Sequence, residues 1–205
     1  GKGTRMENTL PKQYLCIHDK PVFSYSLEPI IHHPSIDDVI VVCDPKYRHF
    51  FKNYPVRFAI PGDRRQDSVF SALKEDHESD LICIHDGARP FLTEEILTKL
   101  LSAAITYQAA ALGKKVTHTI KQLNQQNNLV SLNRETLYEI YTPQVILKPL
   151  LMKGYEYIHQ KGLTVTDDLS IIEPFNIQPK IITPDFPGIK ITHPQDLKIA
   201  KAFLS

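Results

Sequence analysis

The sequence predicts a single α/β domain in which a mostly parallel, twisted sheet carries helices on both faces. Short runs rich in valine and isoleucine, such as 38–43 (DVIVVC) and 80–85 (DLICIH), alternate with longer stretches of helical period. Parallel strands that are buried on both faces form near-continuous apolar runs of this kind, and helices usually connect them. The 205 residues fit one domain, 1–205, and contain no linker that would divide it.

Several helices of the first half are marked by their starting residues. Pro21 suits the first position of a helix, because the amide hydrogen that proline lacks has no partner there. Thr93 suits an N-cap, and Glu95 adds a carboxylate to the first turn. The expected elements are, in order, a helix over 21–33, a strand over 38–43, a helix from about 45, a strand over 56–60, a helix over 67–75, a central strand over 80–85 and a helix over 93–107.

The segment 117–143 differs in character from the rest of the chain. It is polar and has short alternating pieces on either side of a turn rich in glutamine and asparagine (NQQNN), which is typical of a hairpin. A hairpin that cannot bury itself usually packs on another subunit. We therefore expect a protruding β-hairpin arm that joins two chains in a homodimer, with a flexible insertion as the alternative.

The last part of the chain returns to alternating helices and strands. The triplet Thr166, Asp167 and Asp168 has the residue types of a helix start, and a metal site is the second interpretation. The expected elements are a helix over 147–160, a short helix after 166–168, a strand over 180–183 and a closing amphipathic helix over 193–204.

The composition indicates a soluble protein of the cytoplasm. Lysine and arginine number 24 against 23 aspartate and glutamate, so the net charge of +1 gives no reason to expect nucleic-acid or membrane binding. Cys16, Cys43 and Cys83 are widely spaced and form no CxxC pair, which favours free thiols in a reducing compartment. No run reaches the length of a membrane span.

The opening stretch of the chain combines glycines with cations. Gly1 and Gly3 allow a tight turn that brings backbone amides close to an anion, and Arg5 and Lys12 add two positive charges. This combination suits a polyphosphate. Such a loop normally follows a buried parallel strand, yet no apolar run precedes it in these 205 residues.

Three further polar motifs follow expected strands, where ligands bind in open α/β sheets. They are 62–68 (GDRRQDS), 86–89 (DGAR) and 189–192 (IKIT). Ser68 could contact a base or ribose, and Asp86 suits Mg²⁺, which prefers a carboxylate together with phosphate oxygens.

Each motif also has a purely structural interpretation. Asp67 and Ser68 could cap a helix, and Asp86 could cap a turn or pair with Arg89. Lys190 is harder to explain structurally, because an ammonium buried without a partner is costly.

Several catalytic motifs do not occur in the sequence. It contains no GxxxxGK[ST] phosphate loop, no GxSxG nucleophile turn and no HExxH metal motif. Several cations and one well-placed acid, without an evident covalent nucleophile, favour phosphoryl or nucleotidyl transfer by positioning and charge neutralisation.

Taken together, these motifs resemble those of the 2-C-methyl-D-erythritol 4-phosphate cytidylyltransferases of the non-mevalonate isoprenoid pathway. The resemblance covers nearly the whole chain. The matching stretches are 1–14 (GxGxRM, then PKQY), 62–69 (GD, then RxDSV), 85–90 (HDxARP), 119–121 (TIK), 134 with 142–144 (R, then TPQ), 166–168 (TDD) and 189–197 (IKIT, then PxDL).

The resemblance implies a Rossmann-like nucleotidyltransferase domain, CTP and Mg²⁺ as partners in catalysis, and pyrophosphate as by-product. Arg5 and Lys12 would hold the triphosphate and neutralise charge at the α-phosphorus, and Asp86 would orient the metal. Lys190 would be the third catalytic residue. The cytidine would be surrounded by Gly1, Gly3, Gly62, Asp63, Ser68 and Gly87.

The same resemblance implies which residues meet the methylerythritol phosphate. Arg89, Thr119 and Lys190 would contact it, joined by Arg134 and Thr142 from the arm of a partner chain.

This chain departs from the family pattern at three positions around that acceptor site. His118 precedes TIK where aspartate is usual, Tyr141 precedes TPQ where glutamine is common, and Gly188 precedes IK where asparagine is common. Ribitol-5-phosphate cytidylyltransferases share most of the motifs and are the nearest alternative. A non-catalytic nucleotide-binding dimer is an alternative of another class.

Overall fold

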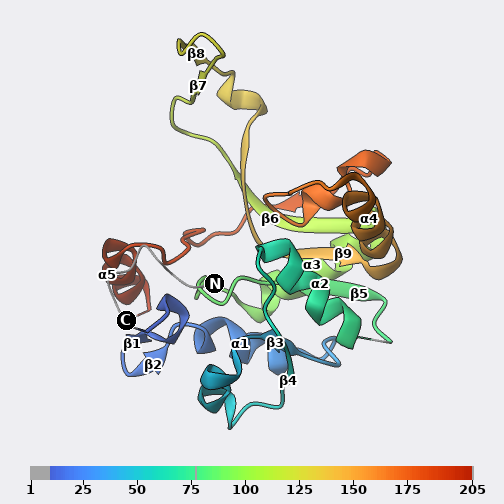
Figure 1. Ribbon diagram of the computed structural model, residues 1–205. Coiled ribbons are helices and arrows are strands. Elements are labelled where there is room, and N and C mark those ends of the chain that lie inside the picture. The colour runs from blue at the N-terminus through green and yellow to red at the C-terminus, as the bar shows by residue number, and fades with distance from the viewer. Residues whose placement is uncertain (1–9, 77, 205) are drawn as a thin grey trace.

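A computed structural model describes residues 10–76 and 78–204, and its main element is a mixed four-stranded sheet (Figure 1). The strand order is β10-β6-β9-β5, with β10 parallel to β6 and β9 antiparallel to both of its neighbours. The strands span Leu81–Ile84 (β5), Ala109–Lys115 (β6), Tyr138–Leu147 (β9) and Lys180–Ile182 (β10).

The α/β class is confirmed, but two expectations about the sheet are wrong for the described residues. The four-stranded sheet is mixed rather than mostly parallel, because β9 returns from β6 through a hairpin and must therefore run antiparallel to it. The run 80–85 forms β5, which lies at the edge of this sheet beside β9 rather than at its centre.

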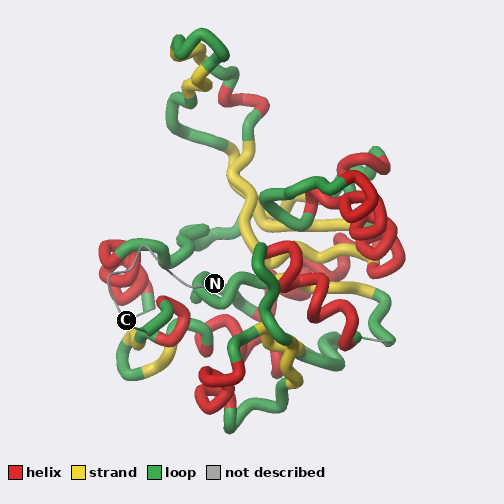
Figure 2. Tube along the Cα trace, in the orientation of Figure 1, coloured by secondary structure: helices red, strands yellow, loops and turns green. Residues whose placement is uncertain are grey.

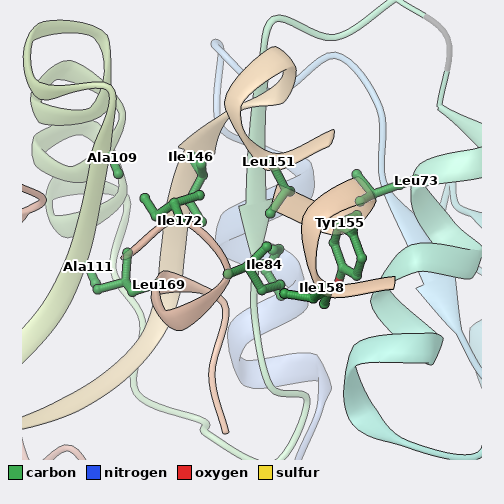
Figure 3. Close-up of a cluster of buried hydrophobic side chains, with 11 residues drawn as sticks. Leu73, Ile84, Ala109, Ala111, Ile146, Leu151, Tyr155, Ile158, Leu169 and Ile172 are labelled. Carbon is green, nitrogen blue, oxygen red and sulfur yellow. The ribbon is translucent and has the colours of Figure 1, made fainter. Parts of the chain in front are cut away.

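Helices cover both faces of the sheet. Successive side chains of a strand point to opposite faces, and on both faces these side chains are apolar and buried. Ala109, Ala111 and Ile146 face one core cluster, which contains residues of α4 (Lys148–Lys161) and α2 (Arg65–Glu75) and is drawn in Figure 3. Ala110, Leu112 and Val145 face the other, built on α3 (Glu94–Tyr107). Each fully buried leucine or isoleucine contributes roughly 1.5–3 kcal/mol of transfer free energy.

A smaller parallel pair of strands lies beside an aromatic cluster. β3 (Ile40–Val42) pairs with β4 (Arg57–Ala59), and a 3₁₀ segment, η2 (Pro45–Phe51), connects them. Tyr14 and Phe23, which belong to η1 (Lys12–Tyr14) and to the turn before α1 (Ser24–Ile31), pack with Phe51 of η2. This cluster fixes η1 and α1 against the strand pair.

The remaining elements are short apart from the closing helix. A hairpin of β1 and β2 was not expected, and Pro21, the expected first residue of the first helix, belongs to this hairpin instead. The bounds are Cys16–Ile17 (β1), Lys20–Pro21 (β2), Lys121–Leu123 (β7), Leu129–Ser131 (β8), Arg134–Thr136 (η3), Leu169–Ile171 (η4), Glu173–Phe175 (η5) and Pro194–Phe203 (α5).

The expected arm projects from the body as a two-stranded ribbon (Figures 1 and 2). Beyond the sheet, β6 and β9 remain paired, with Lys115 opposite Tyr138, and β7 and β8 form the hairpin at the tip. The expected C-terminal bound of the arm, at 143, lies too far along the chain. Residues 138–147 form β9, whose second half is buried in the sheet.

Candidate active site

Asp86 lies just after β5 and is surrounded by three cations from three separate parts of the chain. Its carboxylate is 2.6 Å from Lys190 Nζ, 3.4 Å from Arg65 Nε and 3.5 Å from Arg89 Nε, and its side chain is 15% exposed. Burial by itself would raise the Asp86 pKa, but Lys190 and the two arginines outweigh it and hold that pKa well below the usual range. Asp86 is therefore ionised at neutral pH.

Arg65 connects Asp86 to a second, fully buried carboxylate. Its two terminal nitrogens donate to the two oxygens of Asp168, at 2.8 and 2.6 Å. Burial raises the pKa of Asp168, and the Arg65 guanidinium opposes that rise. Arg65 is the first residue of α2, where a cation is disfavoured by the helix dipole. That unfavourable position is a sequence signal for a special role, and our sequence interpretation overlooked it.

Gln144, on β9, holds the backbone that carries Asp168. Its Oε1 accepts hydrogen bonds from the amides of Asp168 and Leu169, both at 2.9 Å, and its Nε2 donates to Asp167 at 3.1 Å. The side chain is almost fully buried, so these bonds are protected from water. The first interpretation of 166–168, a helix start, agrees with η4, which begins at Leu169, while the second, a metal site, has no support in this geometry, since Asp168 is paired with Arg65.

Thr142 and His85 brace the turn at Asp86. The Asp86 amide donates to Thr142 Oγ1 at 3.0 Å, and the Thr142 hydroxyl lies 3.3 Å from His85 Nδ1. His85 Nε2 is 3.0 Å from the carbonyl oxygen of Arg89. Burial lowers the pKa of His85 to about 4, so a neutral ring donates from Nε2 and accepts at Nδ1.

The expectation that Thr142 comes from the arm of a partner chain is therefore wrong. Thr142 lies on β9 of the same chain and accepts from the Asp86 amide of that chain.

The segment 188–191 docks on the turn 86–89 through backbone contacts. Arg89 Nη1 donates to the Gly188 carbonyl at 2.6 Å, and the Ile191 amide donates to the Ala88 carbonyl at 2.8 Å. These two bonds bring Lys190 to Asp86 across about a hundred residues of sequence. Lys190 thus has the carboxylate partner that a half-buried ammonium requires.

The loop 62–68 lies next to this cluster because Arg65 belongs to both. A Cβ on Gly62 would lie 2.4 Å from Asp67 Cβ, so only glycine fits this close approach. The Gly62 amide donates to Ser68 Oγ at 3.1 Å, and the Arg64 amide donates to Asp67 at 3.1 Å. Asp67 therefore caps α2, as its structural interpretation predicted, and Ser68 closes the loop. Asp63 lies exposed within that loop.

Phe23 contacts both η1, which contains Lys12, and the turn at Gly87. Lys12 begins η1, whose Tyr14 packs edge-on against Phe23 with ring centroids 5.9 Å apart. A Cβ on Gly87 would lie 3.8 Å from Phe23 Cβ, which is ordinary contact. The turn 86–89 and η1 therefore share one aromatic support.

Some of the expected site residues do not gather around Asp86. Thr119 and Arg134 lie on the exposed arm, where Arg134 Nη1 donates to the Thr117 carbonyl at 2.8 Å. Gly1, Gly3 and Arg5 lie outside the described residues.

The cluster has the charge of an anion-binding site. Lys190, Arg65 and Arg89 carry three positive charges against the two carboxylates of Asp86 and Asp168, and none of the three cations is fully exposed. Partly desolvated cations stabilise phosphate charge more strongly than the same groups in water.

Comparison of the sequence with known protein families indicates which anions this site binds. The family model for 2-C-methyl-D-erythritol 4-phosphate cytidylyltransferase matches residues 1–205. The chain belongs to this family. It is 43% identical to the cytidylyltransferase of Chlamydia pneumoniae, over 100% of this chain and 95% of that protein. It is 40% identical to a chloroplastic cytidylyltransferase from rice, over 100% of this chain and 72% of the rice protein.

Solved cytidylyltransferase structures have the same fold. The crystal structure of 4-diphosphocytidyl-2C-methyl-D-erythritol synthase from Anaerococcus prevotii superposes with a TM-score of 0.86 at 27% identity, covering 97% of this chain and 95% of that one. The cytidylyltransferase from Thermus thermophilus gives 0.83 at 26% identity, covering 97% and 96%. The Rossmann-like nucleotidyltransferase domain expected from the motifs is confirmed.

Within the part of the chain that the structure describes, Asp86 is the candidate ligand for the metal that the family motifs imply. Among the described residues, no three histidine, cysteine, aspartate or glutamate side chains form a metal-binding group. Mg²⁺ is often held by one or two carboxylates together with phosphate oxygens and water. Asp86 fits an ion of that kind, which arrives with a phosphate ligand, and it does not fit an all-protein site.

Within the ranges 10–76 and 78–204, no helix is long and apolar enough to cross a bilayer.

Proposed function

We propose that this chain transfers the cytidylyl group of CTP to the phosphate of 2-C-methyl-D-erythritol 4-phosphate. The products are 4-diphosphocytidyl-2-C-methyl-D-erythritol and pyrophosphate. The observation that carries the proposal is the cluster at Asp86, where Lys190, Arg65 and Arg89 converge within 3.5 Å of one carboxylate. The identity of the substrates is inferred from the family to which the chain belongs.

The reaction forms one phosphorus–oxygen bond and breaks another. An oxygen of the acceptor phosphate attacks the α-phosphorus of CTP, and the bond from that phosphorus to the bridging oxygen of pyrophosphate breaks. Both substrates are anions, so their repulsion opposes attack until cations screen it. Lys190 and Arg89 are proposed to receive the acceptor phosphate, while Lys12 with Arg5 stabilises the triphosphate.

The remaining site residues bind rather than react. The loop that contains Gly62, Asp63 and Ser68 is proposed to contact cytidine together with Gly87, Gly1 and Gly3. Asp86 is proposed to hold Mg²⁺, which neutralises triphosphate charge when it is bound with CTP. The ionised state of Asp86 supports this role.

The decisive assay is pyrophosphate release from CTP and Mg²⁺ with each of two polyol phosphates. We expect turnover with methylerythritol phosphate, a lower kcat/KM with ribitol 5-phosphate, and no turnover in excess EDTA. Reactions without a polyol phosphate are the control for CTP hydrolysis. Faster turnover with ribitol 5-phosphate would favour the alternative enzyme, and CTP binding without turnover would favour a non-catalytic dimer.

We further propose that the chain is a homodimer joined through its arm. Leu129 and Leu123 at the tip of the arm are 67% and 58% exposed, and Val130 is 47% exposed. A two-stranded hairpin is marginally stable in water by itself. Burial of these side chains on a second copy would stabilise it, and Thr119 and Arg134 would reach the partner's site in such an assembly.

Sedimentation velocity at micromolar concentration tests the dimer. We expect about twice the chain mass of 23.4 kDa for the wild type and the mass of a single chain for Leu129→Glu. Ile105→Glu is the matched control, because Ile105 is equally exposed, at 68%, but lies on α3. A monomeric wild type, or the same result for both variants, would contradict an arm-mediated dimer.

A cytoplasmic location remains a prediction. Cys16, Cys43 and Cys83 are all free thiols in the structure, which suits a reducing compartment.

A further inference from the structure

The guanidinium of Arg89 contacts three groups of the protein. Its Nε is 3.5 Å from Asp86, its Nη1 donates to the Gly188 carbonyl at 2.6 Å, and its guanidinium carbon lies 5.3 Å from the centre of the Tyr141 ring. Only the first of these contacts belongs to the charged cluster. The other two come from Tyr141 and Gly188, which are two of the three positions where the sequence differs from the family motifs that it resembles.

The Tyr141 ring fits its position only because residue 188 has no side chain. A Cβ on Gly188 would lie 2.3, 2.4 and 2.6 Å from three carbons of the Tyr141 ring. Real side chains do not approach so closely, so the ring would have to move to accept an alanine there. The Tyr141 ring and the missing side chain at Gly188 are therefore sterically matched.

The outer end of the ring is tied to the strand that carries it. Its hydroxyl donates to Glu139 at 2.5 Å on the same strand, and burial together with Glu139 raises the pKa of Tyr141 to about 12. The cavity bounded by Tyr141, Arg89, Gly188 and neighbouring residues holds about 10 Å³, which is about one water molecule. Because the guanidinium of Arg89 packs over the same ring, a displaced ring would change the position of Arg89.

We propose that Tyr141 and Gly188 are a matched pair of positioning residues that sets where Arg89 presents its guanidinium to the acceptor phosphate. The proposal rests on the acceptor role proposed above for Arg89. Tyr141 directly precedes Thr142, and Gly188 lies two residues before Lys190, so the pair also joins the two segments that brace and neutralise Asp86.

Steady-state kinetics of single and double variants tests the pair. Gly188→Ala is expected to raise KM for the acceptor roughly tenfold or more and to leave KM for CTP within about twofold. Tyr141→Ala is expected to raise the acceptor KM roughly three- to thirtyfold, since a desolvated cation–π contact is lost. Adding Gly188→Ala to Tyr141→Ala should then have almost no further effect, because the ring is gone.

Two further variants separate positioning from simple packing. Tyr141→Phe keeps the ring and is expected to stay within about threefold of the wild type. Tyr107→Ala removes a ring that also lies beside a cation, Lys180 at 5.4 Å, but on the far end of α3, and it should change neither KM. An equal cost of Gly188→Ala in both backgrounds, or a parallel rise in KM for CTP, would overturn the proposal.

Calorimetry of inorganic phosphate binding measures the effect of Tyr141 and Gly188 on anion affinity without relying on turnover. The same non-additive pattern of dissociation constants is expected, because Arg89 would contact phosphate whichever polyol carries it. If the dissociation constants of the wild type and the variants follow this pattern but the wild type transfers no cytidylyl group, the proposed function is refuted and the matched pair is still supported. An active wild type with additive variants would refute the pair alone.

Discussion

Replacing Lys190 with methionine is expected to lower kcat for cytidylyl transfer by roughly 10²- to 10³-fold, the scale reported for loss of one preorganised electrostatic group. Of the three described cations around Asp86, Lys190 Nζ lies nearest to its carboxylate, at 2.6 Å, and it would stabilise a charge that develops during attack. Methionine keeps most of the side-chain length without the charge. KM for CTP should change only a few fold, because the loss falls mainly on the transition state.

Two further variants test whether the loss of kcat comes from the charge at position 190. Lys190→Arg keeps the charge but spreads it over a planar group, so partial activity is expected. Lys99→Met removes a lysine with a similarly short ion pair, 2.5 Å to Glu95, on the exposed surface of α3, and kcat should be unchanged. Pyrophosphate release under saturating substrates is the measurement. A Lys190→Met enzyme with wild-type kcat would exclude a catalytic role for this side chain.

Replacing Arg65 with methionine is expected to lower the free energy of unfolding by about 3–5 kcal/mol at neutral pH, since it leaves a buried carboxylate without its partner. Both oxygens of Asp168 accept from Arg65, and the Asp168 side chain is 0% exposed. Urea unfolding followed by circular dichroism measures the loss. A variant within about 1 kcal/mol of the wild type would contradict the assigned role of this pair.

The pH dependence of that loss follows from the direction of the Asp168 pKa. Burial raises this pKa, and removing Arg65 removes the group that opposes the rise. A carboxyl whose pKa is raised on folding keeps a proton that the unfolded chain has released, so stability falls as pH rises from about 4, the unfolded value, through the folded pKa. The difference between the wild type and Arg65→Met should therefore be largest near neutral pH and shrink toward about pH 4.

Two controls isolate the buried pair. Arg64→Met breaks a similar two-bond contact with Asp67, but this pair is solvent-accessible, and a much smaller loss than for Arg65→Met is expected. The double variant Arg65→Met with Asp168→Leu removes both charges, and most of the stability should return because apolar groups of similar size can replace a buried ion pair.

Local signals in the sequence were sufficient to predict helices, whose hydrogen bonds and caps join residues that are close in the sequence. The helix expected over 93–107 is α3, with Thr93 Oγ1 accepting from the Ile96 amide at 3.3 Å, and the helix expected over 147–160 is α4. Strand β6 was missed, because Ala109–Lys115 is rich in alanine and glycine, which have low strand propensity. It is a strand because small side chains fit between α3 and the helices of the other face.

Strand β9 was missed for a different reason. Its first half continues the polar ribbon of the arm, so its alternation indicated a hairpin, and only the second half, from Thr142, is buried. The order of strands in the sheet depends on which distant segments pair, and no local pattern encodes that choice.

The sequence by itself determined the α/β class, the family, the arm and the residue types of the site. Asp86, Arg89, Lys190 and the loop with Ser68 were each found from a local motif, because glycine, cation and carboxylate spacing reflects chemistry that acts within a few residues. Only the tertiary structure decided their partners. The pairing of Arg65 with Asp168 and the fit of Tyr141 over Gly188 join segments 103 and 47 positions apart, and such contacts depend on backbones brought together by the core rather than on neighbouring residues.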